Sequence, residues 1–290
     1  MNTIKNMWVK FKQHWTLIKS KQTFLLVITG WAGFASAACP VTHRPTLLAA
    51  LVCMFLVISG CTMYNMIYDR DIDAKMKRTV KRPLPSGELS VREVFIVATI
   101  ITVVGLVGAY RLSPLFSLIL ATGLFIDAVV YTIWLKRHTA YSIIFGGVSG
   151  GMPILAGRAL GLGSVDIIGA LLALAILLWI PTHIMTFSIK YADDYNRAGV
   201  PTFPSEYGVD ITRKLIALST VLASIAMVLA AHLIGIRGYY GLAMIVFSVA
   251  LISLATVYIK RPSPKLDMRL FKVASLYMLG AMLLIGLGVA

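Results

Sequence analysis

The chain has 290 residues, of which 58% are hydrophobic and only 13% are charged. This balance excludes an ordinary soluble domain, in which about 25% of residues are charged, and it predicts an all-α integral membrane protein. The net charge of +15 requires no nucleic-acid partner, because basic residues on one side of a membrane, in contact with anionic lipid, account for it.

The first 22 residues form a polar, basic stretch with no visible cleavable signal. An apolar stripe at helical spacing faces away from three lysines (Trp8, Phe11, Trp15 and Ile18 against Lys10, Lys12 and Lys19). We therefore expect residues 1–22 to form an amphipathic segment on the inner membrane surface. Residues 23–290 are expected to form a single transmembrane domain.

Nine apolar stretches are close to the roughly 20 residues that a membrane-spanning helix requires. They cover residues 23–42, 46–68, 93–111, 113–134, 140–163, 166–189, 213–235, 239–259 and 270–290. The sequence thus predicts a nine-helix transmembrane bundle.

Basic residues are unevenly divided between the two sets of loops. The N-terminal stretch and every second loop after it hold 23 of the 27 Lys and Arg residues. By the positive-inside rule, this side is cytoplasmic. We therefore expect a multi-pass protein of the cell membrane with its N-terminus inside and its C-terminus outside.

A regular acidic stripe follows the second apolar stretch. Asn65, Asp69 and Asp73 are four residues apart, so on a helix they lie on one face with about 40° of drift per step. Mg²⁺ is commonly held by one or two carboxylates together with substrate phosphate oxygens. The basic residues that follow are suited to contact phosphate (Arg70, Lys75, Lys77, Arg78, Lys81 and Arg82). The stripe therefore predicts a metal and phosphate site.

The stretch 113–134 contains one carboxylate, Asp127, where an apolar or aromatic residue is expected. An ionisable residue inside the membrane indicates a functional site. Asp127 could instead be a neutral, hydrogen-bonded structural acid, and the sequence leaves both interpretations open.

A second acidic loop, residues 190–213, follows the sixth stretch. Asp193 and Asp194 are adjacent, so they point about 100° apart on a helix and only one can face a given ligand. Lys190 precedes Asp194 by one turn. The pair is either a simple ion pair or a carboxylate and a cation directed at the same phosphate group.

These motifs together resemble the UbiA-type intramembrane prenyltransferases, whose first motif is NxxxDxxxD. Within that family the chain is most similar to the haem O synthase branch. The segments that carry the resemblance are NMIYDRDIDAKMKRTVKRPLPSG (65–87), VVYTIWLKRHT (129–139), GGVSGGMPILAG (146–157) and WIPTHIMTFSIKYADDYNRAGVPTFP (179–204).

The resemblance implies a bundle of the UbiA type in which the two acidic loops hold Mg²⁺ and an isoprenyl pyrophosphate. The residues implied in catalysis are Asn65, Asp69, Asp73, Asp193 and Asp194, of which Asp69, Asp73 and Asp194 would bind the metal. Those implied in substrate binding are Lys75, Arg78, Arg82, Lys136, Arg137, Lys190, Tyr191 and His183. The substrates implied are farnesyl pyrophosphate and haem B, the product is haem O, and a haem-modifying enzyme or terminal oxidase is an implied functional partner.

Two departures from the family pattern bear on these expectations. Quinone-type members carry DxxxD in the second loop, whereas Lys190 occupies the first of those positions here. His183 lies in PTHIMTF, where haem-branch members read PHF; it could approach the porphyrin or serve packing. Two alternatives remain: a UbiA-type enzyme with a quinone-precursor or lipid acceptor, and a cation-coupled transporter.

Overall fold

The computed structural model describes residues 2–37 and 44–289, and all regular structure within these ranges is helical. Eight of the described helices are long and apolar enough to span a membrane. They are α3 (Arg44–Tyr68), α5 (Val91–Leu112), α6 (Pro114–Phe125) with its continuation, α7 (Ser142–Leu162), α8 (Ile167–Lys190), α11 (Val209–Ile234), α12 (Gly238–Lys260) and α13 (Pro264–Gly288).

The first predicted span corresponds to the shorter helix α2 (Ser20–Ala35). The end of the predicted range 23–42 lies outside the described residues. With α2 beside the eight longer helices, the described chain confirms the expected bundle.

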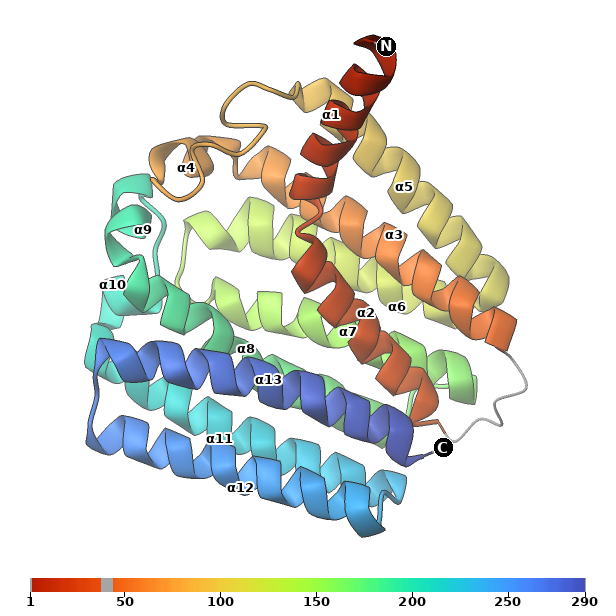
Figure 1. The fold of residues 1–290 in the computed structure, drawn as a ribbon, viewed down its shortest axis with the longest axis vertical. Helices are drawn as coiled ribbons and strands as arrows, with labels where there is room; N and C mark the ends of the chain where they lie inside the picture. Colours follow the sequence, from red (N-terminus) through yellow and green to blue (C-terminus); the bar gives the residue numbers. More distant parts are fainter. Residues whose placement is uncertain (1, 38–43, 290) are drawn as a thin grey trace.

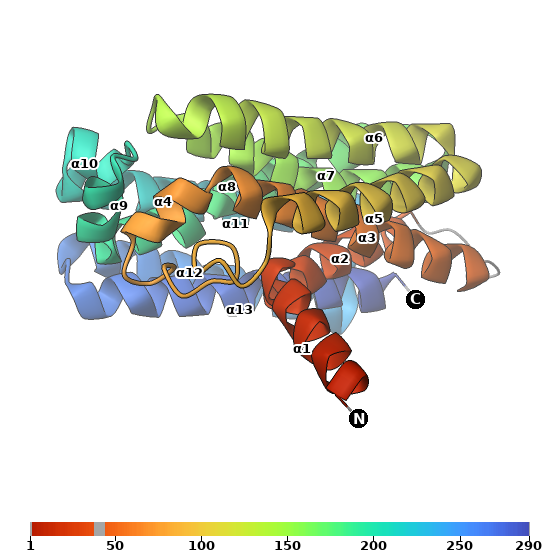
Figure 2. The ribbon, with the colours of Figure 1, turned by 90° about the horizontal axis from the view of Figure 1, so that it is seen from above.

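The long helices run alongside one another and form a closed ring (Figure 1). In chain order, α2 packs on α3, α3 on α5, α5 on α6, α6 on α7, α7 on α8, α8 on α11, α11 on α12 and α12 on α13. Helix α13 then packs on α2 and closes the ring. Figures 1 and 2 both show the short helices α4 (Arg70–Lys75), α9 (Ala192–Ala198) and α10 (Phe203–Tyr207) gathered at one end, which we call the charged end.

Helix α2 also packs closely against α7 across the ring. A Cβ atom on Gly33 would collide with the backbone of Ile154, and one on Gly157 would collide with the backbone of Gly30. Small residues allow membrane helices to approach this closely. Gly33 and Gly157 thus allow the backbones of α2 and α7 to pack in direct contact.

The predicted span 113–134 is a helix of changing geometry. Ser113 caps α6, which passes at Ile126 into the π-helix η2 (Ile126–Trp134) and then into the 3₁₀ turn η3 (Leu135–Arg137). π-Helical turns are rare and frequently occur at functional sites. Asp127 lies in the first turn of this π-helix.

A short N-terminal helix, α1 (Asn2–Leu17), precedes α2, and the chain bends between them at Lys19, whose φ is +47°. Trp8 and Phe11 are 57% and 53% exposed, and Trp15 stacks on Phe11 with ring centroids 5.9 Å apart. The described part of α1 therefore carries the predicted aromatic stripe. Its position on a membrane surface stays a prediction.

Helices α11 and α13 extend further at the charged end than hydropathy predicts, and α11 begins at Val209 rather than at residue 213. Helix α13 begins at Pro264 rather than at residue 270, with Ser263 as its N-cap. Asp267 in this extra turn is only 3% exposed and forms an ion pair of 2.8 Å with Arg213 of α11. A buried ion pair is compatible with a helix, but its two charged residues lower the mean hydropathy of the sequence around them. The apolar pattern therefore could not reveal the first turns of α11 and α13.

Candidate active site

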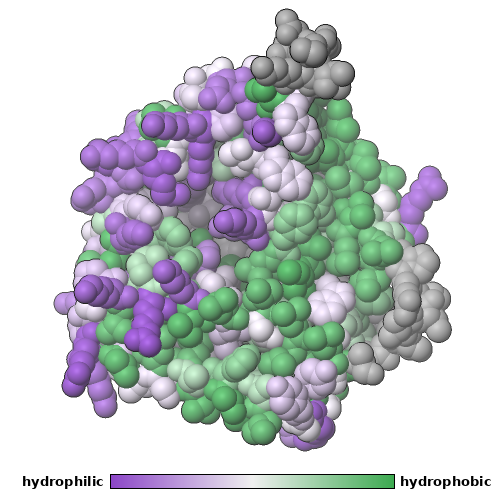
Figure 3. Space-filling model, viewed as in Figure 1, coloured by the Kyte–Doolittle hydropathy of each residue, from purple (hydrophilic) through white to green (hydrophobic). Residues whose placement is uncertain are grey.

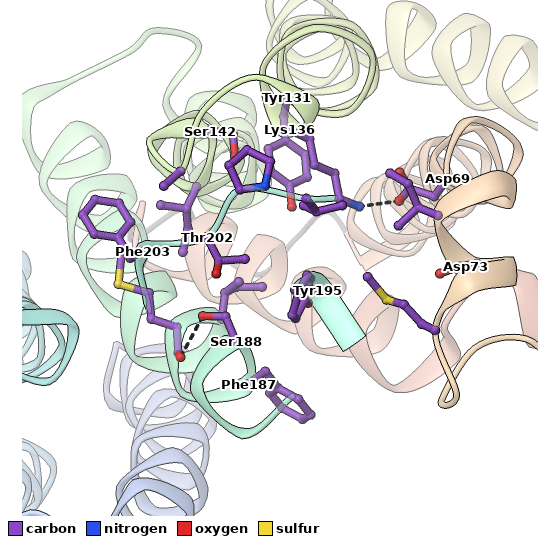
Figure 4. Close-up of a pocket in the computed structure, with 18 of the residues that line it drawn as sticks. Asp69, Asp73, Tyr131, Lys136, Ser142, Phe187, Ser188, Tyr195, Thr202 and Phe203 are labelled. Carbon is purple, nitrogen blue, oxygen red and sulfur yellow. Dashed lines mark hydrogen bonds and ion pairs between the residues drawn. The ribbon is translucent and has the colours of Figure 1, made fainter. Parts of the chain in front are cut away.

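A polar cavity of about 310 Å³ opens at the charged end. Figure 3 shows hydrophilic side chains gathered around a hollow over this part of the molecule. The predicted site residues that line the cavity are Asp69, Asp73, Arg78, Arg82, Lys136 and His183. Figure 4 shows Asp69 and Asp73 on one side of the cavity, with Lys136 and Tyr131 beside Asp69. Segments far apart in the sequence therefore meet here.

Asp69 occupies the junction between α3 and α4, where it is 8% exposed. Its Oδ2 atom lies 2.5 Å from Nζ of Lys136, which follows the π-helix. Its Oδ1 atom is buried and has no hydrogen-bond partner among the described residues. A buried carboxylate oxygen without a partner is costly, so this atom is suited to bind a ligand that completes the site.

Asp73 lies one turn further along the chain, on α4. Its Oδ2 atom accepts a hydrogen bond of 2.6 Å from Arg82. The backbone N–H of Asp73 bonds to the carbonyl of Asp69 at 2.7 Å, which preserves the helical spacing across the junction. The two predicted metal ligands therefore face the same cavity, and each is paired with a basic residue.

This donor set fits Mg²⁺ in the form that the ion takes with phosphate substrates. The described residues contain no group of three or more His, Cys, Asp or Glu side chains placed to hold a metal. Two carboxylates with a free oxygen instead match a site in which substrate phosphates and water supply the remaining ligands.

A larger, mainly apolar cavity of about 490 Å³ adjoins the polar one. Five residues line both cavities (Lys19, Gln22, Tyr131, His183 and Ile184). A charged group at the entrance and an apolar chain in the interior can therefore belong to the same ligand.

Asn65 lines the apolar cavity and not the polar one. Its Nδ2 donates a hydrogen bond of 2.6 Å to Oδ2 of Asp127, and its Oδ1 accepts one of 3.0 Å from Thr132. The predicted stripe is thus divided, since its two aspartates face the polar cavity while the amide of Asn65 is bonded to groups of η2.

His183 of α8 stands between the two cavities. Its ring lies 4.9 Å from that of Trp179 and 4.7 Å from that of Phe271, measured between centroids. Its Nδ1 lies 3.5 Å from the hydroxyl of Ser275. The ring is therefore held among aromatic side chains while it faces the shared space.

The acidic residues of the second loop do not line either cavity. Asp193 is exposed, whereas Asp194 is 7% exposed and pairs with Arg197. Oδ1 of Asp194 also accepts a bond of 3.3 Å from the backbone N–H of Lys77 in the first loop. Burial raises the pKa of Asp194, but the hydrogen bonds from Arg197 and Lys77 lower it overall. Asp194 therefore links the two loops.

The remaining predicted substrate-binding residues, Lys75, Arg137, Lys190 and Tyr191, line neither cavity. Lys75 is exposed, and Lys190 lies over the ring of Tyr191 at 5.1 Å from its centroid. Arg78, which does line the cavity, covers the same ring at 5.2 Å. The Tyr191 ring therefore makes cation–π contacts with both Arg78 and Lys190.

Arg137 is turned outward. It pairs with the exposed Asp71 at 2.7 Å and also donates to the backbone carbonyl of Tyr68. The hydrogen bond from Arg137 lowers the pKa of Asp71 to about 2. This pair joins η3 to the start of α4 outside the cavity.

The sequence did not single out Lys19 or Tyr131 as site residues, although both line the two cavities. Burial, followed by the charges of Arg82 and Lys136, lowers the pKa of Lys19. Lys19 was assigned to the solvated face of a continuous surface helix, and the break after α1 turns it inward. Tyr131 could have been found from its place five residues before Lys136, whose Nζ lies 5.8 Å from the tyrosine ring centroid.

Known proteins similar to this chain share its sequence pattern. A profile of the UbiA prenyltransferase family matches residues 26–279. The sequence is 39% identical to a protoheme IX farnesyltransferase of Korarchaeum cryptofilum (strain OPF8), over 92% of this chain and 90% of that protein.

Solved structures share the fold. A digeranylgeranylglyceryl phosphate synthase in membranes superposes with a TM-score of 0.79 at 21% identity, covering 97% of this chain and 98% of the other. A UbiA homologue from Archaeoglobus fulgidus bound to GPP and Mg²⁺ superposes with a TM-score of 0.69 at 18% identity, covering 94% and 99%. With the sequence matches, this agreement leads to one conclusion: the chain belongs to the UbiA prenyltransferase family.

Proposed function

We propose that this prenyltransferase moves a farnesyl group from farnesyl pyrophosphate to a vinyl group of haem B and so forms haem O. The observation that carries the proposal is the pair of joined cavities, one with two carboxylates and several cations and the other mainly apolar. The similarity to protoheme IX farnesyltransferase over most of the chain supports the choice of acceptor.

The polar cavity supplies the pyrophosphate end of the site. Asp69 and Asp73 would hold Mg²⁺, and the unpartnered Oδ1 atom of Asp69 supports this role. When bound, Mg²⁺ would neutralise charge that develops on the departing pyrophosphate. Lys136, Arg82 and Arg78 would contact the phosphate oxygens directly, since charge-assisted hydrogen bonds to phosphate are strong and directional.

The apolar cavity supplies the acceptor end. The farnesyl chain and the porphyrin would lie among apolar side chains that keep water from the allylic cation formed on C1. His183 faces this space between Trp179 and Phe271. Its contact with the porphyrin, through the ring face or the iron, is part of the proposal.

The distribution of basic residues supports a cytoplasmic position for the charged end, with the N-terminus inside and the C-terminus outside. Farnesyl pyrophosphate would then enter from the cytoplasmic side. The product would pass to a haem-modifying enzyme or a terminal oxidase in the same membrane.

The test is a reaction of the purified chain in liposomes with haem B, farnesyl pyrophosphate and Mg²⁺, followed by mass spectrometry of the haem. We expect haem O, and we expect its formation to stop with EDTA and resume when Mg²⁺ is added in excess. Release of pyrophosphate only with quinone-precursor or lipid acceptors would move the chain to another branch of the family. Cation-driven uptake without any prenyl transfer would contradict the proposed function altogether.

A further inference from the structure

Asp127 is a carboxylate in the wall of the mainly apolar cavity. Three side chains donate to it: Asn65 at 2.6 Å and Cys61 at 3.1 Å to Oδ2, and Ser149 at 3.1 Å to Oδ1. All three of these partners are uncharged. Helices α3, α7 and η2 therefore converge on one acidic group inside the membrane region.

A carboxylate in such a place is costly, and three neutral hydrogen bonds offset only part of the cost. The three donors leave acceptor capacity unused, because the two oxygens of a carboxylate together offer about four lone-pair sites. The π-helical turn that carries Asp127 is itself a rare geometry that often marks functional sites. These features together point to a role for Asp127 in the reaction that takes place in the cavity.

The position of Asp127 relative to the metal carboxylates is defined by its partner Asn65. Asn65 precedes Asp69 by one turn of α3, which is about 6 Å along the helix axis. Asp127 thus lies deeper than the pyrophosphate end, on the side to which the farnesyl carbon and the acceptor extend. A group at this depth is near the atoms that react after pyrophosphate has left.

We infer that Asp127 is a catalytic residue, and this inference rests on the proposed function. Asp127 binds the water molecule that adds to the haem vinyl carbon after farnesyl transfer, and it accepts a proton from that water. Ser149 and Asn65 fix the carboxylate, and the lone pairs that remain on its oxygens accept a hydrogen bond from the water. The negative charge also stabilises a nearby carbocation, because charges interact strongly in a site of low dielectric constant.

The step balances in atoms and charge. The terminal vinyl carbon bonds to C1 of the farnesyl group as the C1–O bond to pyrophosphate breaks, and a cation remains on the vinyl carbon attached to the porphyrin. The oxygen of the water bonds to that carbon, and one of its protons passes to Asp127. That proton then passes to solvent, so the net reaction consumes haem B, farnesyl pyrophosphate and water, and it gives haem O, pyrophosphate and one proton.

The inference predicts a change in the product rather than only in the rate. In Asp127→Asn the farnesyl group is still transferred, but the cation is not captured by an activated water and instead loses a proton from the adjacent carbon to the released pyrophosphate. The product is then an alkene lighter than haem O by one water. We expect the ratio of hydrated to dehydrated product to fall roughly 100-fold, the usual contribution of a general base, while pyrophosphate release continues.

Two further variants distinguish the loss of the carboxylate from a general loss of folding. Asp127→Ala opens space beside Ser149, and added formate should restore the hydrated product in it. Thr122→Ala is the matched control, because Thr122 is an exposed residue of α6 whose hydroxyl bonds only to the carbonyl of Leu118 in its own helix. We expect the control to give the wild-type product ratio.

The outcomes separate the two proposals. If the wild type forms haem O and Asp127→Asn gives the same product ratio, the role of Asp127 is overturned and the proposed function stands. Reduced thermal stability with an unchanged ratio also overturns it, since that is the result of a structural acid. If the wild type forms no farnesylated haem, the proposed function fails and the role of Asp127 fails with it.

Discussion

The two acidic loops at the charged end look alike in sequence but differ in the structure. Each begins where a long helix leaves the apolar region, and each contains aspartates followed by prolines. The aspartates at 69 and 73 face the polar cavity and are paired with Lys136 and Arg82. In the second loop, Asp193 is exposed and Asp194 is bonded to Arg197 and to the first loop.

The direction in which a carboxylate points therefore matters more than its place in a motif. A four-residue spacing keeps two side chains on one face, and the first loop has that spacing, whereas adjacent aspartates diverge. The metal role that the resemblance assigns to Asp194 stays a prediction. Variants of the two loops can decide it.

The largest effect is expected from Asp69→Asn. The change removes a charge that would hold Mg²⁺, and metal stabilisation of a departing group contributes several kcal/mol. Turnover should therefore fall on the order of 1000-fold. Steady-state release of pyrophosphate at several Mg²⁺ concentrations measures this turnover. Activity at the wild-type level would contradict the proposed role of Asp69 as a metal ligand.

A smaller loss is expected from Lys136→Met, which keeps an unbranched side chain only one atom shorter but removes its charge. The ion pair of 2.5 Å with Asp69 and the contact with phosphate are both lost. Hydrogen bonds to charged groups are each worth about 1.5–3 kcal/mol, so kcat/KM should fall about 10- to 100-fold. Lys136→Arg is the control, and an equal loss in both variants would show that geometry rather than charge is required.

Asp194→Ala should act mainly on stability and loop order. The variant loses the bonds to Arg197 and to the backbone of Lys77, so we expect a lower melting temperature and faster proteolysis of residues 76–90. Turnover should fall less than about tenfold. Asp193→Asn is the matched control with no expected change. A loss in Asp194→Ala as large as that in Asp69→Asn would instead establish the second loop as a metal ligand.

The smallest effect is expected from Asp71→Asn, which breaks the exposed pair with Arg137. The folded pKa of Asp71 is lowered to about 2, so its stabilising contribution is present above the unfolded value of about 4 and disappears as pH falls toward the folded value. Because the pair is exposed, the difference from wild type should be at most a few tenths of a kcal/mol. Thermal unfolding at neutral and acidic pH tests this, and a difference that grows on acidification would contradict it.

Much of the fold could be predicted from the sequence because a bilayer imposes long apolar helices. The all-helical membrane bundle and the place of the first acidic loop followed from hydropathy, and the family followed from the combined motifs. The first predicted span corresponds to the shorter helix α2, so the count of nine is approximate. Lys19 was missed because no local pattern marks the break that turns it inward. Asn65 was placed with Asp69 by spacing, but Asp127 and Thr132, more than 60 positions away, bind its amide. Contacts of that range depend on helix packing, which spacing alone does not contain.

The closure of the ring by α13 has a consequence for how the protein is made. Phe271 and Ser275 of this helix line the apolar cavity, and α13 packs on α2, which is synthesised long before it. Domains and helices emerge from the ribosome in order, and contacts between distant parts of a chain form late. The residues of the polar cavity can therefore come together before the apolar cavity has its final wall, and the insertion of α13 is the event that closes the apolar cavity.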